Sequence, residues 1–387
     1  MVCVTGARRL QVEGWRFLPH SYALVAQSHC LWLARRGDVE LRFADLPFYD
    51  PGWKPARGIF ASADEALLSS LRAPEASFSP QATFTLRPER PDFSAPRTGE
   101  RFAFATAEYR VLTPANVGAL RSAADVPSCV QVVTPSRWAA EAYRRFGFAD
   151  ARIHVVPHGI DPAIFRPDEA ARLVTRRALG VEREVLFACA GAMTWNKGLD
   201  ALLKAFARLV ESEPEVRLLL KGADALYPSR ELVREVLGDL PSQARSAVTA
   251  RLIYEGRTFS AKVMAELLRA ADCYVSPYRA EGFNLPVLEA MACGVAVICT
   301  AGGPTDEFTE QSFALRIPGR VAPKRLDADH EGEMLEPDVE QLSALMRDTA
   351  RDPAAARGRG ALAARCAHER FSWEAVTNAL LAALFPA

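Results

Sequence analysis

The chain has 387 residues, which is long for a single hydrophobic core and typical of two domains. Apolar residues make up 49% and charged residues 24%, as in globular proteins, and a formal net charge of zero does not favour nucleic-acid binding. The first 160 residues carry 19 Lys and Arg against 15 Asp and Glu, a mild excess that suits an anionic substrate or an anionic membrane surface.

The cysteines and the N-terminal residues indicate the cellular compartment of the protein. The eight cysteines form no Cys-x-x-Cys pair, so we expect reduced thiols in a cytosolic protein. No basic N-terminal segment is followed by an apolar stretch, so no signal peptide is expected. No apolar run approaches the ~20 residues that span a bilayer. We therefore expect a cytoplasmic protein, with peripheral contact at the inner face of the membrane left open.

The first half alternates strand-like and helix-like segments, which is typical of a parallel α/β domain. A strand is predicted at residues 2–5, followed by a loop at 14–20 and a helix over 21–36. Ser136 is predicted to cap a later helix, residues 137–146. Further strands are predicted at 39–43, 82–86, 102–106 and 130–134.

The second half repeats this pattern after a segment rich in Pro and Gly, residues 155–161. We interpret that segment as a domain crossing, which divides the chain into residues 1–160, joined by a C-terminal helix at 372–387, and residues 161–371. Strands are predicted at 185–190, 216–221, 251–255, 272–276 and 295–300. They alternate with helices predicted at 199–211, 231–237 and 261–271.

Two carboxylates eight positions apart, Glu281 and Glu289, occur in the run EGFNLPVLEAMACG. The run follows a predicted strand, and Pro286 suits the first turn of a helix. Glu281 is therefore expected on a loop at the strand's carboxyl end and Glu289 one turn into the helix. Ligands bind at that edge of parallel sheets, and helix N-termini attract anions, so a nucleotide sugar would fit. The spacing alone also fits two solvent-facing acids.

The run resembles the E-x7-E signature of GT4-type retaining glycosyltransferases. Their GT-B fold has two Rossmann-like α/β domains whose parallel sheets face each other across a cleft, with a C-terminal helix packing back on the N-terminal domain. The PHGID stretch at 157–161 and the Asn-Lys-Gly stretch around Lys197 resemble the same family. The resemblance covers nearly all of residues 130–387 and is weaker before them.

The resemblance implies a hexosyltransferase-type enzyme that transfers a sugar from a UDP-, GDP- or ADP-linked donor with retention. The acceptor would be a glycan, a lipid-linked group or a protein, with no metal or other cofactor required and no nucleic-acid partner. The N-terminal domain would bind the acceptor, and the C-terminal domain would bind the nucleotide sugar. Two alternatives stay open: a phosphorylase or starch-synthase-like enzyme on the same fold, and a non-catalytic sugar- or protein-binding module.

The resemblance also implies roles for individual residues. Glu281 would position the sugar and stabilise its developing charge, Glu289 would hydrogen-bond the ribose, and Lys197 would neutralise the departing diphosphate. Many relatives carry an Arg five residues before the Lys, where this chain has Ala192. Either an Arg from elsewhere replaces it, or Lys197 suffices with backbone amides and the helix dipole. The residues expected to offer backbone N–H groups to the donor are Gly282, Phe283, Asn284 and Leu285.

Five further residues are weaker candidates. Gly14 is expected to approach the diphosphate from a loop, and Glu108 to lie near the donor sugar after the strand at 102–106. Arg257 follows a strand end whose loop meets the nucleobase in relatives, although a solvent-facing arginine is an equal alternative. His20 and Ser21, where the first loop enters its helix, are candidates for acceptor binding, and an ordinary loop histidine is the alternative for His20.

No metal site is expected. Asp327-Ala328-Asp329 has the spacing that binds divalent cations in a different glycosyltransferase fold, but no buried strand is predicted before it. The histidines show no metal-ligand spacing. A Gly-x-Gly-x-x-Gly motif is absent, which disfavours a dinucleotide-dependent oxidoreductase.

Overall fold

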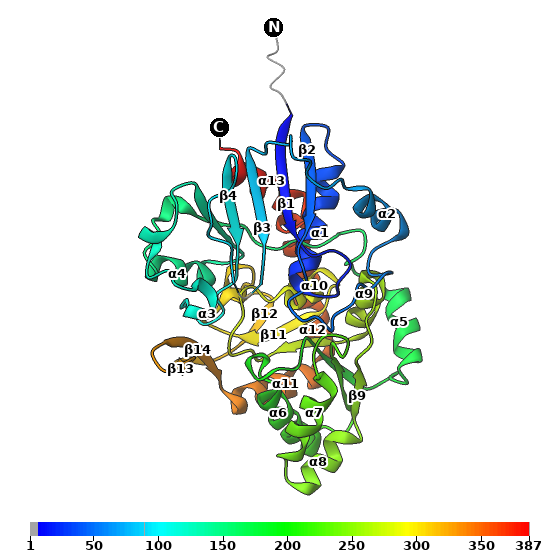
Figure 1. Cartoon of the computed structure of the whole chain (residues 1–387). Helices are drawn as coiled ribbons and strands as arrows, with labels where there is room; N and C mark the ends of the chain where they lie inside the picture. Colours follow the sequence, from blue (N-terminus) through cyan, green and yellow to red (C-terminus); the bar gives the residue numbers. More distant parts are fainter. Residues whose placement is uncertain (1–6, 89, 387) are drawn as a thin grey trace. The chain divides into compact units, whose positions relative to one another are not determined.

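A computed structural model of the chain describes residues 7–88 and 90–386 (Figure 1). It contains two compact units. The first consists of the chain up to Gly159 together with Arg325–Gly332 and the residues from Trp373 onward, and the second consists of Ile160–Lys324 and Glu333–Ser372. The division at 159/160 lies one residue from the boundary predicted at 160/161.

The first unit is built on a six-stranded parallel sheet with the strand order β2-β1-β3-β4-β5-β6. Its strands are β1 (Arg8–Gly14), β2 (Val39–Asp45), β3 (Ala82–Leu86), β4 (Glu100–Phe104), β5 (Val130–Thr134) and β6 (Ile153–Val155). Its α-helices are α1 (Ser21–Ala34), α2 (Ser62–Ser70), α3 (Pro114–Val117), α4 (Arg137–Arg145) and α13 (Trp373–Leu384). As predicted, Ser136 caps α4, and its hydroxyl accepts a hydrogen bond from the Ala139 N–H at 3.1 Å.

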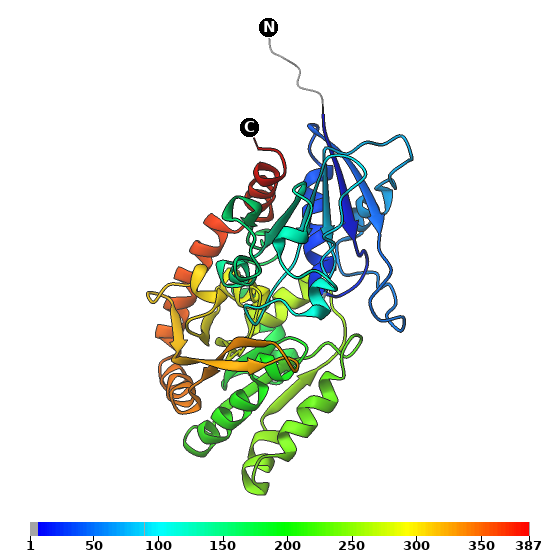
Figure 2. The ribbon, with the colours of Figure 1, turned by 60° about the vertical axis from the view of Figure 1, so that its left-hand side comes forward.

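The C-terminal helix α13 completes the core of this first unit. Figures 1 and 2 show α13 beside α1, and Leu380, Leu381 and Leu384 of α13 are buried in one apolar cluster with residues of α1, β1 and β3. His29 of α1 lies in the same layer, with its Nδ1 2.9 Å from the Thr377 hydroxyl, and burial lowers the pKa of His29 to about 3. The predicted return of the C-terminal helix to the N-terminal domain is therefore confirmed.

The second unit has its own six-stranded parallel sheet, in the order β12-β11-β10-β7-β8-β9. Its strands are β7 (Val185–Ala190), β8 (Val216–Lys221), β9 (Leu252–Glu255), β10 (Cys273–Ser276), β11 (Ala296–Thr300) and β12 (Ala314–Ile317). Its helices are α5 (Glu169–Ala178), α6 (Leu199–Ser212), α7 (Ser229–Gly238), α8 (Ser242–Thr249), α9 (Ala261–Ala270), α10 (Leu285–Ala292), α11 (Val339–Arg351) and α12 (Pro353–Arg370). A separate two-stranded sheet follows β12 and consists of β13 (Gly319–Arg325) and β14 (Glu331–Pro337).

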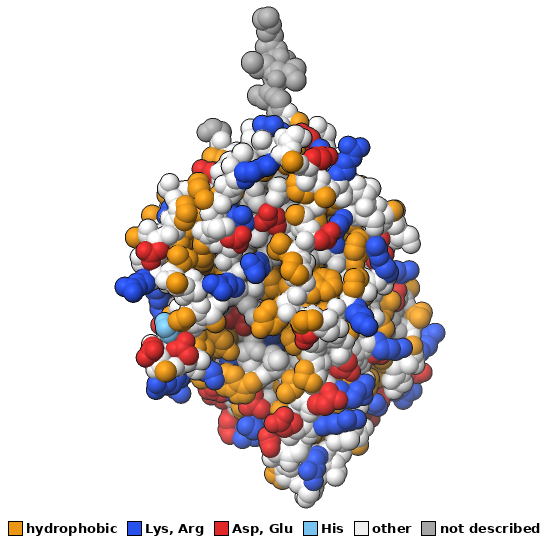
Figure 3. Space-filling view, in the orientation of Figure 1, with side chains coloured by type: hydrophobic (Ala, Val, Ile, Leu, Met, Phe, Trp, Pro, Cys, Tyr) orange, Lys and Arg blue, Asp and Glu red, His pale blue; other side chains and the backbone are white. Residues whose placement is uncertain are grey.

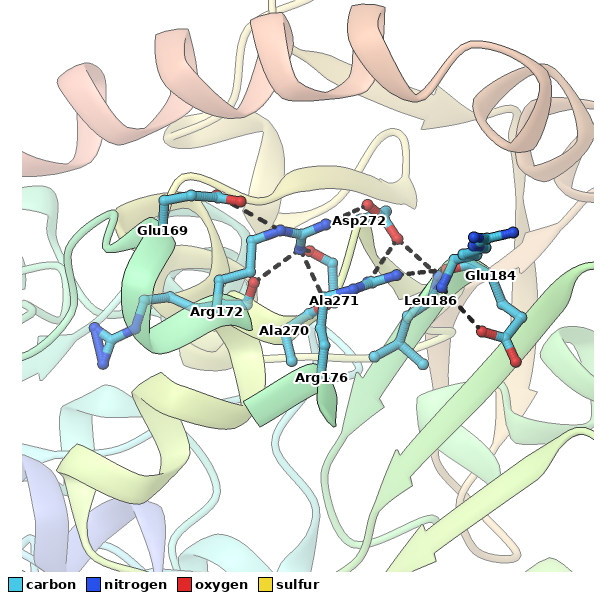
Figure 4. A network of polar contacts seen from close by, with 10 residues as sticks. Glu169, Arg172, Arg176, Glu184, Leu186, Ala270, Ala271 and Asp272 are labelled. Carbon is cyan, nitrogen blue, oxygen red and sulfur yellow. Dashed lines mark hydrogen bonds and ion pairs between the residues drawn. The ribbon is translucent and has the colours of Figure 1, made fainter. Parts of the chain in front are cut away.

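A buried carboxylate holds β10 beside β7 at the start of both strands (Figure 4). The Asp272 carboxylate accepts hydrogen bonds from the Leu186 N–H at 2.8 Å, from Arg172 at 2.6 Å and from Arg176 at 3.0 Å. Arg172 also donates to the carbonyls of residues 269, 270 and 271, which end α9. These contacts fasten α5 to the end of α9 and fix the two strands from which the candidate site extends.

Some elements differ from the predictions. The strand predicted at residues 2–5 lies outside the described residues, and the first described strand is β1, which ends at Gly14. Gly14 is therefore a buried strand residue and not the loop residue that was predicted. The sequence analysis did not predict the helices α2, α3, α5, α8, α11 and α12 or the strands β12, β13 and β14. Among these, α2, α5 and α8 each bury a single residue and β13 is mostly exposed, so they have no clear apolar pattern.

Basic and acidic side chains are interspersed over the face shown in Figure 3, in keeping with a formal net charge of zero. Within the described residues, no helix is both long enough and apolar enough to cross a membrane.

Candidate active site

Two loops at the carboxyl ends of the neighbouring strands β7 and β10 are bonded to each other. The first runs from Gly191 to Gly198 and contains a short 3₁₀ turn, Trp195–Lys197. The carbonyl of Asn196 in this turn accepts hydrogen bonds from the N–H groups of Arg279 at 2.7 Å and Ala280 at 3.2 Å. Carboxyl ends of parallel strands are the usual ligand-binding edge of such a sheet.

Gly198 allows this close contact between the loops. It has a φ of +73°, and a Cβ atom placed there would lie 1.9 Å from the carbonyl oxygen of Pro277. Any other residue would have to push the two loops apart. The glycine of the Lys-Gly pair thus serves the packing of the site, and the helix α6 begins directly after it.

The structure brings the two predicted catalytic residues into direct contact. The Lys197 ammonium lies 2.6 Å from a carboxylate oxygen of Glu281. The side chains are 25% and 10% exposed, so the pair is largely withdrawn from water but still reachable by a ligand. A charge-assisted hydrogen bond of this length is strong, and it leaves the pair without net charge.

The four residues predicted to offer backbone N–H groups lie at the start of α10. Asn284 precedes this helix in the left-handed conformation, with φ +77°, which Asn tolerates better than most residues. Its side-chain amide donates to the Ser276 hydroxyl at 2.9 Å, which anchors the turn to the end of β10. Phe283 is packed against Phe308 with ring centroids 4.7 Å apart, so its side chain serves packing. Gly282 precedes it on the same loop, and Leu285 is the first residue of α10.

Glu289 lies further along α10, as predicted. It is half-buried, and burial raises the pKa of its carboxyl to about 8. In the part of the chain that the structure describes, this carboxyl has no hydrogen-bond or ion-pair partner. At neutral pH the ligand-free carboxyl is therefore mostly protonated, which allows it to donate as well as accept a hydrogen bond.

Arg279 is a site residue that the sequence analysis did not identify. Its buried guanidinium bonds Asp200 of α6 at 2.6 Å and Glu336 of β14 at 2.9 Å, and it lies 4.6 Å from the centre of the Trp195 ring. Its carbonyl accepts a hydrogen bond from the Leu335 N–H at 2.8 Å. Burial would lower the pKa of Arg279, but the bonds to the two carboxylates raise it. Arg279 thus ties both loops to β14.

The weaker candidate of the second unit, Arg257, lies on the surface after β9. Its side chain is 76% exposed and bonds Glu255, with Nε 2.9 Å from a carboxylate oxygen. Because β8 separates β9 from β7, Arg257 is further along the sheet edge than Lys197.

The remaining candidates belong to the first unit. His20 precedes α1, its Nδ1 accepts a hydrogen bond from the Tyr22 N–H at 3.2 Å, and its ring lies 5.3 Å from that of Trp15. Ser21 is the exposed first residue of α1. Glu108 follows β4, and its carbonyl accepts a hydrogen bond from the Trp138 indole at 2.8 Å.

The Asp-x-Asp stretch lies in the turn between β13 and β14. A carboxylate oxygen of Asp327 accepts hydrogen bonds from the N–H groups of Asp329 at 2.9 Å and His330 at 2.8 Å, so this side chain holds its own turn. Over residues 7–88 and 90–386, no group of three or more His, Cys, Asp or Glu is placed to hold a metal ion.

Part of the chain is similar in sequence to known proteins. The family Glycosyl transferases group 1 matches residues 184–327. D-inositol 3-phosphate glycosyltransferase of Kribbella flavida is 32% identical over 49% of this chain and 45% of its own length. MMP alpha-(1->4)-mannosyltransferase of Mycolicibacterium hassiacum is 29% identical over 66% of this chain and 53% of its own length. The chain thus spans about half the length of these curated relatives.

Solved structures resemble nearly the whole chain. Sucrose-phosphate synthase from Thermosynechococcus elongatus has a TM-score of 0.67 at 17% identity and covers 96% of this chain and 97% of its own. Anabaena HepE, solved with UDP and glucose, has a TM-score of 0.66 at 15% identity and covers 96% of this chain and 98% of its own. At such identities the likeness shows the fold alone, and it confirms the predicted GT-B class of two α/β domains with parallel sheets.

Proposed function

Residues 184–327 match the glycosyl transferases group 1 family, and from that match we propose that this chain transfers a sugar from a nucleoside-diphosphate donor to an acceptor hydroxyl, with retention at the anomeric carbon. The observation that carries the proposal is the Lys197–Glu281 contact of 2.6 Å beside the start of α10. A cation, a carboxylate and a helix N-terminus then meet at one sheet edge. Such an arrangement suits a ligand that combines hydroxyls with phosphates.

The donor would bind to the second unit. The N–H group of Leu285, the first residue of α10, and the positive end of the helix dipole would face the diphosphate; Pro286 has no N–H, and the Val287 N–H bonds the Asn284 carbonyl at 3.1 Å. Glu289 would hydrogen-bond the ribose, and its protonated form can donate to a ribose oxygen. UDP is bound in the HepE structure, and one curated relative from Corynebacterium glutamicum is named as GDP-mannose-dependent, so UDP-, GDP- and ADP-sugars are all candidate donors.

The chemistry would proceed on one face of the sugar. The bond between the anomeric carbon and the diphosphate breaks, the acceptor oxygen forms its bond on the same face, and the acceptor proton passes to the departing phosphate oxygen. Lys197 would turn from Glu281 toward the leaving diphosphate as charge develops there, and Glu281 would then stabilise the positive charge on the sugar. We assign no metal to this step, and transfer that persists in EDTA would support that assignment.

The acceptor would bind to the first unit, where His20, Ser21 and Glu108 follow strand ends. The names of the relatives include an inositol phosphate and a phosphatidylinositol monomannoside, so a glycan, a lipid-linked group and a protein remain candidate acceptors. A lipid-linked acceptor would bring the protein to a membrane surface as a peripheral protein.

A donor screen tests the proposal. The melting temperature would be measured with UDP-, GDP- and ADP-sugars, because a ligand at ~100 times its dissociation constant stabilises a protein by ~2.7 kcal/mol. Release of the nucleoside diphosphate then separates an enzyme from a binding module. NMR of the product from an α-linked donor should show an α-linkage. A β-linked product would contradict retention, and an absence of binding to every donor would contradict the proposed function.

A further inference from the structure

Lys221 is a buried lysine at the last position of β8, in the sheet that carries the candidate donor loops. Its side chain is 8% exposed, and its ammonium donates a hydrogen bond to the carbonyl of Gly222, the next residue. The side chain therefore folds forward past the end of the strand. An ammonium has three N–H donors, and this is its one hydrogen bond within the described chain.

This burial is costly for the folded protein. Lys221 forms no ion pair within the described residues, and burial lowers its pKa although the charges of Glu255 and Asp224 oppose that change. The ring of Phe259 lies 5.5 Å from the ammonium and offsets part of the cost. An apolar side chain of similar volume would serve the fold better, so a reason other than stability is needed for a cation here.

The loop after β8 lies against the loop that leads to Lys197. The Gly191 N–H donates to the Lys221 carbonyl at 3.0 Å. The Ser229 hydroxyl bonds the Ala192 carbonyl at 2.9 Å and the Ala223 N–H at 3.1 Å, and so joins the two loops. Ala192 carries no charge, and Lys221 is the basic residue whose backbone carbonyl bonds the first residue of this loop.

Charge balance indicates what Lys221 would bind. The Lys197–Glu281 pair is neutral as a unit, and a helix N-terminus contributes only about half a positive charge. A nucleoside diphosphate carries more than one negative charge, while its base and ribose are neutral. We propose that Lys221 is a second cation of the donor site and contacts a diphosphate oxygen, an inference that rests on the proposed function.

Lys221→Met and the matched control Lys262→Met, at an exposed lysine of α9, test this assignment. Calorimetric titration would compare UDP, GDP and ADP with inorganic pyrophosphate and with the free nucleosides. We expect Lys221→Met to weaken the binding of pyrophosphate and of the preferred nucleoside diphosphate at least tenfold and to leave nucleoside binding unchanged. Lys262→Met should change none of these affinities.

The melting temperature of the ligand-free variants provides a second readout. Because Lys221→Met removes a buried charge without an ion-pair partner, the variant should fold and melt at or above the wild-type temperature. A lower melting temperature together with unchanged diphosphate affinity would show a structural lysine and overturn the proposal.

The outcomes separate this inference from the function on which it rests. Nucleotide binding that Lys221→Met leaves unchanged would overturn the inference and keep the proposed function. An equal loss of nucleoside binding would assign Lys221 to the base and overturn the diphosphate contact. Lys221-dependent binding of pyrophosphate without binding of any nucleotide would support the contact and contradict the nucleotide-sugar function. A wild-type protein that binds none of the probes would contradict both.

Discussion

The loops at the carboxyl ends of the two sheets share strained backbone but differ in their side chains. In the part of the chain that the structure describes, four non-glycine residues have a positive φ: Phe17 after β1, Arg110 after β4, Met193 after β7 and Asn284 after β10. Such a conformation costs ~1–3 kcal/mol in most residues and less in Asn, and it tends to occur at functional sites. In each sheet, these strained residues therefore follow the carboxyl ends of strands, which is where parallel sheets bind ligands.

In the second unit this edge is built from charges that are closely paired, with Arg279, Lys197 and Glu281 bonded across loops. In the first unit the corresponding edge is aromatic. Trp15, His20 and Trp53 have ring centroids 5.3–5.6 Å apart, and the nearby Tyr49 is 62% exposed. A charged, closely bonded edge suits a phosphate-bearing donor, and an aromatic edge suits the apolar faces of an acceptor sugar ring. Substitutions at each edge should therefore have different effects.

Arg279→Met should have the largest effect, because it leaves Asp200 and Glu336 without their shared cation. We expect a loss of about 3 kcal/mol in the free energy of unfolding, at the lower end for buried ion pairs that lose one partner, because the remaining Asp200 and Glu336 side chains are 23% and 37% exposed. Urea denaturation measures this loss. Arg279→Lys should recover only part of it, since a lysine cannot form both paired bonds. A fully stable Arg279→Met protein would show that the charged edge does not depend on this residue.

Lys197→Ala should lower turnover by about 10²–10³-fold, or ~2.7–4 kcal/mol, if the ammonium stabilises the leaving group. Its effect on donor affinity should be smaller. Steady-state release of the nucleoside diphosphate measures both. Turnover near the wild-type value would show that another cation stabilises the leaving group.

Glu289→Ala should weaken donor binding by roughly 1–1.5 kcal/mol through loss of the ribose hydrogen bond, since the protonated carboxyl and the ribose hydroxyl are both neutral. Titration with the preferred nucleoside diphosphate measures the change. Equal affinity in the variant and the wild type would show that Glu289 does not contact the donor.

The raised pKa of Glu289 predicts a dependence of stability on pH. The folded protein holds this proton up to about pH 8, whereas the unfolded chain loses it near the ordinary value of 4.5. The folded state thus binds more protons between these values, and this group lowers stability as the pH rises from 4.5 to 8. Glu289→Gln should flatten that decline in melting temperature. Parallel curves for the two proteins would contradict the pKa shift.

Trp53→Ala should have the smallest effect and should act on the other substrate. Losing one aromatic contact of ~0.5–1.5 kcal/mol should raise the acceptor KM by a few-fold. Donor hydrolysis without acceptor should stay unchanged, which makes it an internal control. A loss of donor hydrolysis in this variant would contradict the assignment of the aromatic edge to the acceptor alone.

The sequence predicted the buried strands most accurately. β3, β5, β7 and β8 have the predicted bounds, because strands buried on both faces appear as continuous apolar runs. β1 was missed because its apolar residues alternate with polar ones such as Glu13, which bonds the buried Arg101 at 2.9 Å.

The candidate site could be predicted where its residues are close in sequence, as with Glu281 and Glu289. Arg279 could not, because its partners Asp200 and Glu336 lie 79 and 57 positions away in the chain. Lys221 is notable only through its burial, which no local pattern reveals.

The place of α13 has a consequence for the synthesis of this protein. The strands of the first unit leave the ribosome early, but Leu380 and Leu384, which fill their core, are made after the whole second unit. At 5–20 residues per second, the roughly 225 residues between Gly159 and Leu384 take about 10–45 s to translate. During that interval the nascent first unit exposes an apolar surface on the face of α1. We therefore expect it to be a chaperone client until α13 has been made, while the second unit can already form its sheet.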